Sequence, residues 1–170
     1  MAIRACLGEK KPGVICLVAS TAGIRGNYLA SLYCASKHAI VGFAKSMAEC
    51  DPEEGIRVVC ICPGLVATRL WTDREPEFME MNKYSERPAL GPEHIAEVMV
   101  EMIENEKGED EGGTVVLKTP LEERVIEKGW SNQEGVYDPS PRPKADLGRM
   151  KGLLESERGV KWEEGYQGRK

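Results

Sequence analysis

The chain has 170 residues, enough for one compact domain with its own core, which excludes a miniprotein that depends on disulfides. Hydrophobic residues make up 41% and charged residues 30%, with a net charge of −5, so neither a disordered chain nor a basic nucleic-acid-binding protein is expected. Residues 1–50 carry six basic and two acidic side chains, whereas the remainder carries 17 and 26. We therefore look for chemistry in the less acidic first third.

No stretch reaches the roughly 18 uninterrupted apolar residues that a membrane-spanning helix needs, and the first residues lack the apolar core and cleavage site of a signal peptide. Six cysteines all lie within the first 62 positions, and neither histidine stands at zinc-finger spacing from them. We therefore expect reduced, buried thiols, no metal site, and a cytoplasmic protein without a membrane partner.

The first half of the sequence predicts a strand, a helix and a second strand. Residues 13–20 form a nearly continuous apolar run rich in β-branched residues, which is typical of a strand covered on both faces. A glycine-bearing loop leads to a helical pattern over about 32–50, ended by Asp51-Pro52. Its apolar residues occupy most of the circumference, which predicts burial on more than one side. Residues 56–62 give the second strand.

The second half predicts fewer elements. Residues 64–92 show no regular period, and so long a loop inside a domain is usually functional. A helix is predicted over 92–105 and a third strand over 114–119. Residues 1–119 therefore make one α/β domain with a parallel sheet, and 120–170 are expected to be a polar, proline-containing C-terminal extension. Five large side chains in the long loop suit either an apolar substrate pocket or packing on the sheet: Trp71, Phe78, Met79, Met81 and Tyr84.

The combination that points to chemistry is Ser20, Tyr33 and Lys37. Ser20 ends the first strand, where open α/β sheets place their ligands. Tyr33 and Lys37 are four residues apart, so on a helix they share one face. A tyrosine that exchanges a proton near neutral pH needs its pKa of about 10 lowered at a cost of roughly 4 kcal/mol, and one positive charge about 5 Å away supplies roughly 3 kcal/mol. The spacing thus predicts Tyr33 as general acid/base, assisted by Lys37, with Ser20 hydrogen-bonding the reacting oxygen.

Tyrosine and lysine at this spacing are a weak signal when taken alone. Tyr166 and Lys170 repeat the spacing without a preceding strand or serine. An ordinary surface pair on a helix is the alternative for Tyr33 and Lys37. The strand-end serine and the strand, helix, strand context favour the catalytic interpretation of the first pair.

Residues 13–70 contain three segments that carry a family resemblance: GVICLVASTAG, YCASKHAIVGFAKSMA and GIRVVCICPGLVATRL. They resemble the central part of the short-chain dehydrogenase/reductase family. The Tyr-Cys-Ala-Ser-Lys-His and Ile-Cys-Pro-Gly segments are especially similar to NAD-dependent hydroxyprostaglandin dehydrogenase-like members. The resemblance implies a partial Rossmann-like, doubly wound parallel sheet that comprises only the C-terminal strands and helices of that fold.

By this resemblance Ser20, Tyr33 and Lys37 match the family's catalytic serine, tyrosine and lysine. The tyrosine would transfer the substrate's hydroxyl proton, the lysine would also bind the nicotinamide ribose, and the serine would orient the substrate. The cofactor would be NAD or NADP, with NAD favoured, and the substrate a small alcohol or ketone. Residues 69–92 would form the substrate lid. Six residues would contact the cofactor: Tyr33, Lys37, Pro63, Gly64, Val66 and Thr68.

The sequence also departs from the family pattern. It has no glycine-rich turn of the form Thr-Gly-x-x-x-Gly-x-Gly, which receives the cofactor's pyrophosphate at a helix N-terminus, and no Asn-Asn-Ala-Gly segment. Residues 1–11 are similar to the end of the helix that follows that segment, so Met1 is expected to be an internal methionine and 1–119 the C-terminal half of the domain. Thr119-Pro120 stands where the family has a closing Gly-Gly.

Two interpretations from different classes remain open. The first is an oxidoreductase that moves a hydride between NAD(P) and a secondary alcohol or ketone, and it rests on Ser20, Tyr33 and Lys37. The second is a truncated, non-enzymatic member whose apolar helix mediates association, and it rests on the missing phosphate-binding turn. A homo-oligomer is expected in either case, because the helix over 32–50 is apolar around most of its surface.

Overall fold

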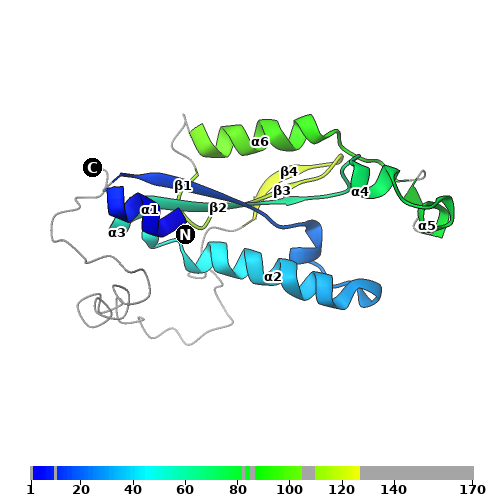
Figure 1. Cartoon of the computed structure of the whole chain (residues 1–170), viewed down its shortest axis with the longest axis horizontal. Helices are drawn as coiled ribbons and strands as arrows, with labels where there is room; N and C mark the ends of the chain where they lie inside the picture. The colour runs from blue at the N-terminus through cyan, green and yellow to red at the C-terminus, as the bar shows by residue number, and fades with distance from the viewer. Residues whose placement is uncertain (1, 10, 82, 85–86, 105–109, 127–170) are drawn as a thin grey trace.

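A computed structural model describes residues 2–9, 11–81, 83–84, 87–104 and 110–126, in which a central sheet carries helices on both faces (Figure 1). None of the helices in these ranges combines the length and apolar character that a membrane span requires. The elements in chain order are α1 (Ala2–Glu9), β1 (Gly13–Val18), η1 (Thr21–Gly23), η2 (Tyr28–Ala30), α2 (Ser31–Ser46), α3 (Cys50–Glu54), β2 (Ile56–Pro63), α4 (Arg69–Thr72), α5 (Pro76–Met81), α6 (Pro92–Glu104), β3 (Val115–Lys118) and β4 (Glu123–Ile126).

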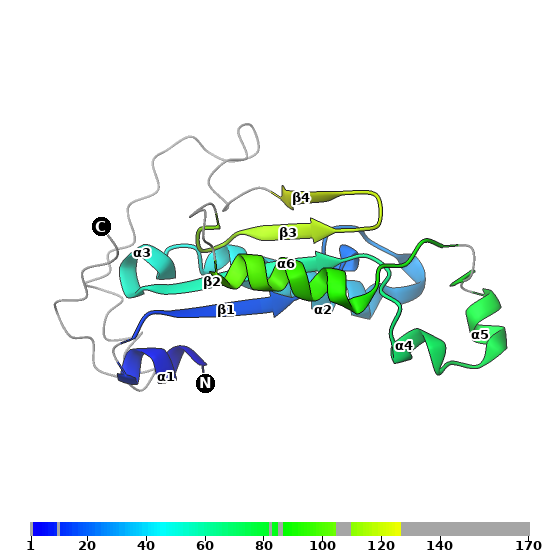
Figure 2. The same ribbon diagram turned by 90° about the horizontal axis from the view of Figure 1, so that it is seen from above.

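The four strands lie in the order β1-β2-β3-β4, as Figure 2 shows from above. β1, β2 and β3 run parallel, and β4 pairs with β3 in the antiparallel sense. The three parallel strands match the predicted ones to within two residues at each end, and the predicted Rossmann-like α/β class is confirmed. β4 is an addition that the apolar pattern did not predict, because its first two residues, Glu123 and Arg124, are charged and most of its residues are exposed.

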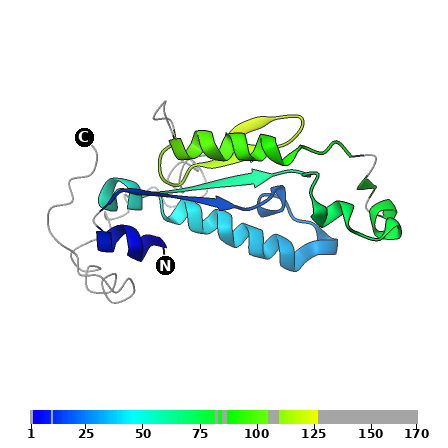
Figure 3. The ribbon, with the colours of Figure 1, turned by 45° about the horizontal axis from the view of Figure 1, so that its top comes forward.

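The core lies on both faces of β2, which explains why its sequence is a continuous apolar run. Every residue of β2 is buried. One set of its side chains packs with α2 and the other with α6, so these two helices cover opposite faces of the sheet (Figure 3). The first set comprises Ile56, Val58, Cys60 and Cys62, and the second comprises Val59 and Ile61.

The predicted helix over 32–50 divides into two. α2 ends at Ser46, where the backbone N–H of Met47 bonds carbonyls of the preceding turn, and α3 begins at Cys50. Pro52 therefore does not end a helix as predicted but lies in the first turn of α3, where the missing N–H has no intrahelical partner to lose. Gly55 ends α3 in the left-handed conformation, with a φ of 68°.

The outer face of α2 is uncovered in the part of the chain that the structure describes. Cys34, Val41 and Ala44 are buried on its inner face. Leu32 and Phe43 remain 86% and 48% exposed. The expectation that this helix is buried on more than one side is therefore not met by the chain itself.

Arg57 anchors the carboxyl end of α6 to the sheet. It lies on β2 with 5% of its surface exposed. Its guanidinium donates hydrogen bonds to the carbonyls of Met102, Ile103 and Asp110 at 2.5, 2.7 and 3.1 Å. The Met102 and Ile103 carbonyls lie in the last turn of α6, so the cation satisfies acceptors that the helix end leaves open, and the Asp110 carbonyl ties the following segment to the same group.

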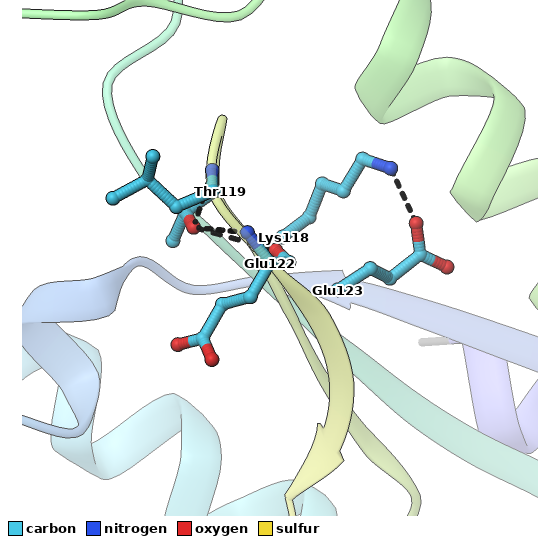
Figure 4. A network of polar contacts seen from close by, with 5 residues as sticks. Lys118, Thr119, Glu122 and Glu123 are labelled. Atoms are coloured by element: carbon cyan, nitrogen blue, oxygen red, sulfur yellow. Dashed lines mark hydrogen bonds and ion pairs between the residues drawn. The ribbon is translucent and has the colours of Figure 1, made fainter.

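The hairpin between β3 and β4 forms where the family pattern has two glycines (Figure 4). The Thr119 hydroxyl accepts hydrogen bonds from the N–H groups of Leu121 and Glu122 at 3.3 and 3.1 Å. The Lys118 ammonium pairs with the Glu123 carboxylate across the hairpin. Thr119-Pro120 thus makes a turn that returns the chain along the edge of the sheet.

Candidate active site

The predicted site residues gather at the carboxyl ends of β1 and β2. Ser20 follows β1 with extended backbone, and its hydroxyl caps η1 by accepting the Ala22 N–H at 3.2 Å. Ser20 is partly buried, so its hydroxyl lies at the edge of the sheet rather than in the core. This is the place where parallel α/β sheets present groups to ligands.

Tyr33 and Lys37 share one face of α2, as their spacing predicts. The Lys37 ammonium lies 5.7 Å from the centre of the Tyr33 ring. The same ammonium donates a hydrogen bond to the Val18 carbonyl at 3.2 Å. Lys37 therefore contacts both the Tyr33 side chain and the end of β1, the strand that precedes Ser20. The Tyr33 side chain is about half exposed, which leaves it accessible to a substrate.

Gly23 makes this juxtaposition sterically possible. A Cβ at this position would lie 2.8 Å from the Lys37 carbonyl oxygen and 3.0 Å from Cγ2 of Val41, closer than real contacts allow. Only glycine lets η1 lie directly against α2 at Lys37. The sequence shows a glycine-bearing loop here, but the close approach depends on tertiary packing and has no signature in the local sequence.

The other predicted cofactor contacts lie at the carboxyl end of β2: Pro63 is its last residue, and Gly64, Val66 and Thr68 follow it. Because β1 and β2 are parallel with Val18 opposite Ile61, these residues leave the sheet at the same edge as Ser20. The Gly64 N–H bonds the Lys118 carbonyl at 2.8 Å, which ties this segment to the end of β3 as well. Thr68 precedes α4, and its side chain makes no capping hydrogen bond there.

The predicted lid is partly helical. It contains α4 and α5, which project beyond the carboxyl ends of the parallel strands (Figures 1 and 2). Its base is closed by Ala67 N–H to Leu90 O at 2.8 Å and Leu90 N–H to Leu65 O at 2.9 Å. Within this segment Trp71 of α4 stacks on Tyr84 with ring centres 5.5 Å apart. Phe78 also approaches Trp71, with ring centres 6.1 Å apart, so three of the aromatic side chains of this segment pack on one another.

Within the ranges described, no cluster of three or more His, Cys, Asp or Glu side chains is suited to hold a metal ion. The donor set at the sheet edge instead suits an organic ligand with hydroxyl groups. It offers a phenol, a serine hydroxyl and one ammonium group from Tyr33, Ser20 and Lys37. None of the six cysteines in this part of the chain forms a disulfide.

The fold and the site together define a class of protein, in which a Rossmann-type sheet carries a serine, a tyrosine and a lysine at its carboxyl edge. The model of the short chain dehydrogenase family matches residues 1–78. A short-chain dehydrogenase/reductase homolog, YusR of Bacillus subtilis, is 36% identical over 99 residues, which cover 58% of this chain and 76% of that protein. The chain belongs to the short-chain dehydrogenase/reductase family.

Two further relatives show how much of a family member the chain represents. Meso-2,3-butanediol dehydrogenase of Serratia marcescens is 37% identical over 94 residues, which cover 53% of this chain and 37% of that enzyme. A 4-hydroxyisoleucine dehydrogenase mutant, solved with NADH and succinate, superposes with a TM-score of 0.58 at 26% identity over 68% of this chain and 49% of its own. The chain thus spans about two-fifths of the length of the first curated relatives it matches, 42% and 37%.

Proposed function

We propose that the protein is an NAD(P)-dependent oxidoreductase of the short-chain type that interconverts a secondary alcohol and a ketone. One observation carries the proposal, namely the position of the Lys37 ammonium between the Tyr33 ring and the end of the Ser20 strand. A cation held in this place stabilises negative charge on a nearby phenol or substrate oxygen. The family membership supports the same reaction class.

Each residue has a distinct role in the proposed reaction. Tyr33 takes the hydroxyl proton of the alcohol as the carbonyl forms, and returns a proton in the reverse direction. Ser20 orients the substrate oxygen with its hydroxyl. Lys37 supplies positive charge beside Tyr33 and hydrogen-bonds the ribose of the cofactor. A nicotinamide bound at this edge of the sheet would supply the hydride acceptor or donor.

The residues present suit the nicotinamide end of the cofactor. Tyr33 and Lys37 offer donors for ribose hydroxyls, and the segment of Pro63, Gly64, Val66 and Thr68 leaves the sheet at the same edge. The sequence has no glycine-rich turn for the pyrophosphate. NAD is the favoured cofactor, from the likeness to hydroxyprostaglandin dehydrogenase-like members, and two neighbouring structures were solved with NADH. We propose a cytoplasmic location and a small alcohol or ketone as substrate.

The domain assignment gives the first test. We propose that residues 1–119 are the C-terminal half of the catalytic domain and 120–170 an extension. The 170-residue chain is then expected to bind NAD with a Kd above about 1 mM, because the helix N-terminus that binds pyrophosphate contributes much of the affinity. Joined behind a glycine-rich strand, turn and helix segment, it is expected to bind NAD at least tenfold more tightly and to oxidise a secondary alcohol. Calorimetry and nicotinamide absorbance measure both; micromolar NAD affinity of the chain alone would refute the assignment.

The second candidate function is an association module, and the uncovered outer face of α2 favours it. Tyr28 and Leu29 of η2, directly before this helix, and Leu32 in its first turn are 95%, 91% and 86% exposed. Phe43 continues the same face toward the other end of the helix. Exposed apolar side chains grouped in this way mark protein interfaces. We propose that this face joins two copies of the chain, whether or not the protein is also an enzyme.

The double substitution Leu32→Glu with Phe43→Glu is expected to raise the dimer dissociation constant at least tenfold, because it buries two charges in an apolar contact. Sedimentation velocity at several protein concentrations measures the change. Val100→Glu on α6 is the matched control, since Val100 is 49% exposed, like Phe43 at 48%, but lies on the opposite face of the sheet. A dimer with a dissociation constant of about 100 μM has an association free energy of about 5 kcal/mol. A wild-type chain that stays monomeric at that concentration contradicts the proposal.

A further inference from the structure

The turn between β3 and β4, residues 119–122, lies at the edge of the sheet that carries the candidate site and has no role in the proposed reaction. β3 runs parallel to β2, with Lys118 opposite Pro63, so the turn follows the carboxyl end of β3. Here the Gly64 N–H donates a hydrogen bond to the Lys118 carbonyl at 2.8 Å. The turn thus begins where the segment assigned to the cofactor leaves the sheet.

Thr119, the first residue of this turn, lies on the face of the sheet that α2 covers. Along β3, Val115 and Leu117 pack with α2, whereas Val116 packs with α6. Successive side chains of a strand point to opposite faces, so the same alternation continued past β3 places Thr119 on the α2 side. α2 is also the helix that carries Tyr33. Thr119 and the proposed general acid/base therefore belong to the same side of the sheet.

The Thr119 side chain borders Gly64. Apart from the adjoining residues, the three atoms nearest to a Cβ added at Gly64 all belong to Thr119: Cγ2 at 3.4 Å, and Cα and Cβ at 3.5 Å. These are van der Waals distances, so Thr119 lies against the space into which a side chain at position 64 would extend. Gly64 itself is only partly buried. Thr119 is therefore the neighbour that limits movement of Gly64 on this side.

The hydroxyl of Thr119 holds this side chain in place. It accepts hydrogen bonds from the N–H groups of Leu121 and Glu122 at 3.3 and 3.1 Å, and donates to the Glu122 carbonyl at 3.3 Å. The N–H of Thr119 bonds the same carbonyl at 2.8 Å. With Oγ1 fixed in the turn, rotation about χ1 is restricted and Cγ2 stays directed at Gly64. One side chain thus closes the turn with its hydroxyl and contacts the cofactor segment with its methyl group.

We propose that Thr119 is a positioning residue of the candidate site, which links the β3–β4 turn to Gly64 and so fixes the Pro63-Gly64 segment. Its role toward the nicotinamide rests on the proposed function, whereas the link between turn and segment does not. Proline and glycine carry no polar side chain, so the polar contacts of these two residues with a cofactor depend on where their backbone lies. A displacement of about 1 Å in such a contact is enough to weaken binding or rate.

The amide of Gly64 reports on this link in the 170-residue chain without cofactor or substrate. Thr119→Val keeps the shape of the side chain but removes the hydroxyl, so hydrogen exchange of the Leu121, Glu122 and Gly64 amides is expected to accelerate at least fivefold. Thr119→Ser retains the hydroxyl, so exchange of all three amides is expected to stay within about threefold of the wild type.

Glu123→Gln is the matched control, because it breaks the ion pair with Lys118 in the same hairpin. That pair lies on the other side of the hairpin from the Thr119 side chain (Figure 4). Partly exposed pairs contribute little, so Gly64 exchange is expected to stay within about twofold of the wild type. Acceleration of Gly64 exchange by Glu123→Gln that equals the effect of Thr119→Val would overturn the inference, since any weakening of the hairpin would then suffice.

Pro120→Gly is a second variant, which loosens the turn and leaves the Thr119 hydroxyl in place. It is expected to accelerate the exchange of the turn amides and of Gly64 by the same factor, because they open together. If Thr119→Val proves unable to fold, this variant decides. Gly64 exchange that remains at the wild-type rate in folded Thr119→Val or Pro120→Gly protein overturns the inference.

An activity arm separates this inference from the proposed function. In the protein joined to a glycine-rich segment, Thr119→Val is expected to raise the KM for NAD about fivefold and to leave the KM for the alcohol within about twofold. Thr119→Ser is expected to restore the KM for NAD to within about twofold of the wild type. Complete absence of dehydrogenase activity overturns the proposed function while the amide measurements stand. A wild-type KM for NAD in Thr119→Val, together with faster Gly64 exchange, overturns the role toward the cofactor alone.

Discussion

In a form of the protein that binds the nicotinamide cofactor, Tyr33→Phe is expected to lower kcat/KM for a secondary alcohol about a thousandfold, and cofactor affinity by less than about threefold. The substitution removes only the hydroxyl that accepts the substrate proton, and leaves the ring beside the Lys37 ammonium. The rate is followed by nicotinamide absorbance and the affinity by calorimetry. A variant that retains full turnover would exclude Tyr33 as the general acid/base.

Tyr28 provides the matched control for this experiment. It is a tyrosine five positions earlier, 95% exposed, and it lies in η2 ahead of the catalytic helix. Tyr28→Phe is expected to leave both kcat/KM and cofactor affinity within about twofold of the wild type, because the Tyr28 side chain is exposed and is not among the proposed catalytic or cofactor-binding residues. Lys37→Ala is expected to reduce rate and cofactor affinity together, because it loses both the charge beside Tyr33 and the ribose contact. The contrast between Tyr33 and Lys37 variants distinguishes proton transfer from cofactor binding.

The largest effect on stability is expected from Arg57→Ala, which is predicted to lower the free energy of unfolding by roughly 3–5 kcal/mol. It removes three charge-assisted hydrogen bonds, two to the end of α6 and one to the Asp110 carbonyl, and leaves buried or partly buried carbonyls without that donor. Urea denaturation followed by circular dichroism measures the change. This loss is a large fraction of the stability of about 5–15 kcal/mol that is typical of a domain.

Arg124→Ala is the control for charge removal. Arg124 lies on β4 and approaches Glu122 at 3.8 Å, with both side chains about half exposed. Exposed pairs of this kind contribute about 0–1 kcal/mol, so this variant is expected to unfold at nearly the wild-type urea concentration. Equal destabilisation by Arg57→Ala and Arg124→Ala would show that Arg57 acts through net charge and not through its contacts with α6.

Most of the sheet could be predicted from the sequence because its parallel strands are buried on both faces. Such strands appear as uninterrupted apolar runs, as β2 does. β4 could not be predicted in this way, since an edge strand with exposed Glu123 and Arg124 resembles a polar loop in sequence. The end of α2 was also misplaced, because Pro52 is compatible with the first turn of a new helix.

The candidate site could be predicted only in part. The helical spacing of Tyr33 and Lys37 is a local property, so it was visible in the sequence. The contact of Lys37 with the Val18 carbonyl joins residues 19 positions apart and depends on how α2 crosses the sheet. The role of Gly23 likewise arises from the approach of separate elements. Sequence patterns identify such residues as small or apolar and give no sign of their position beside the site.

The two edges of the sheet differ chemically, so a strand from another chain can add to one edge more readily than to the other. The β4 edge is antiparallel and carries Glu123 and Arg124, and charged edge strands resist pairing with other chains. The β1 edge is an apolar parallel strand whose residues are only partly covered. Intermolecular strand addition, whether productive or leading to aggregation, is therefore directed to β1. A strand added there would lie beside the segment that ends at Ser20, so strand addition at this edge would also change the surroundings of the candidate site.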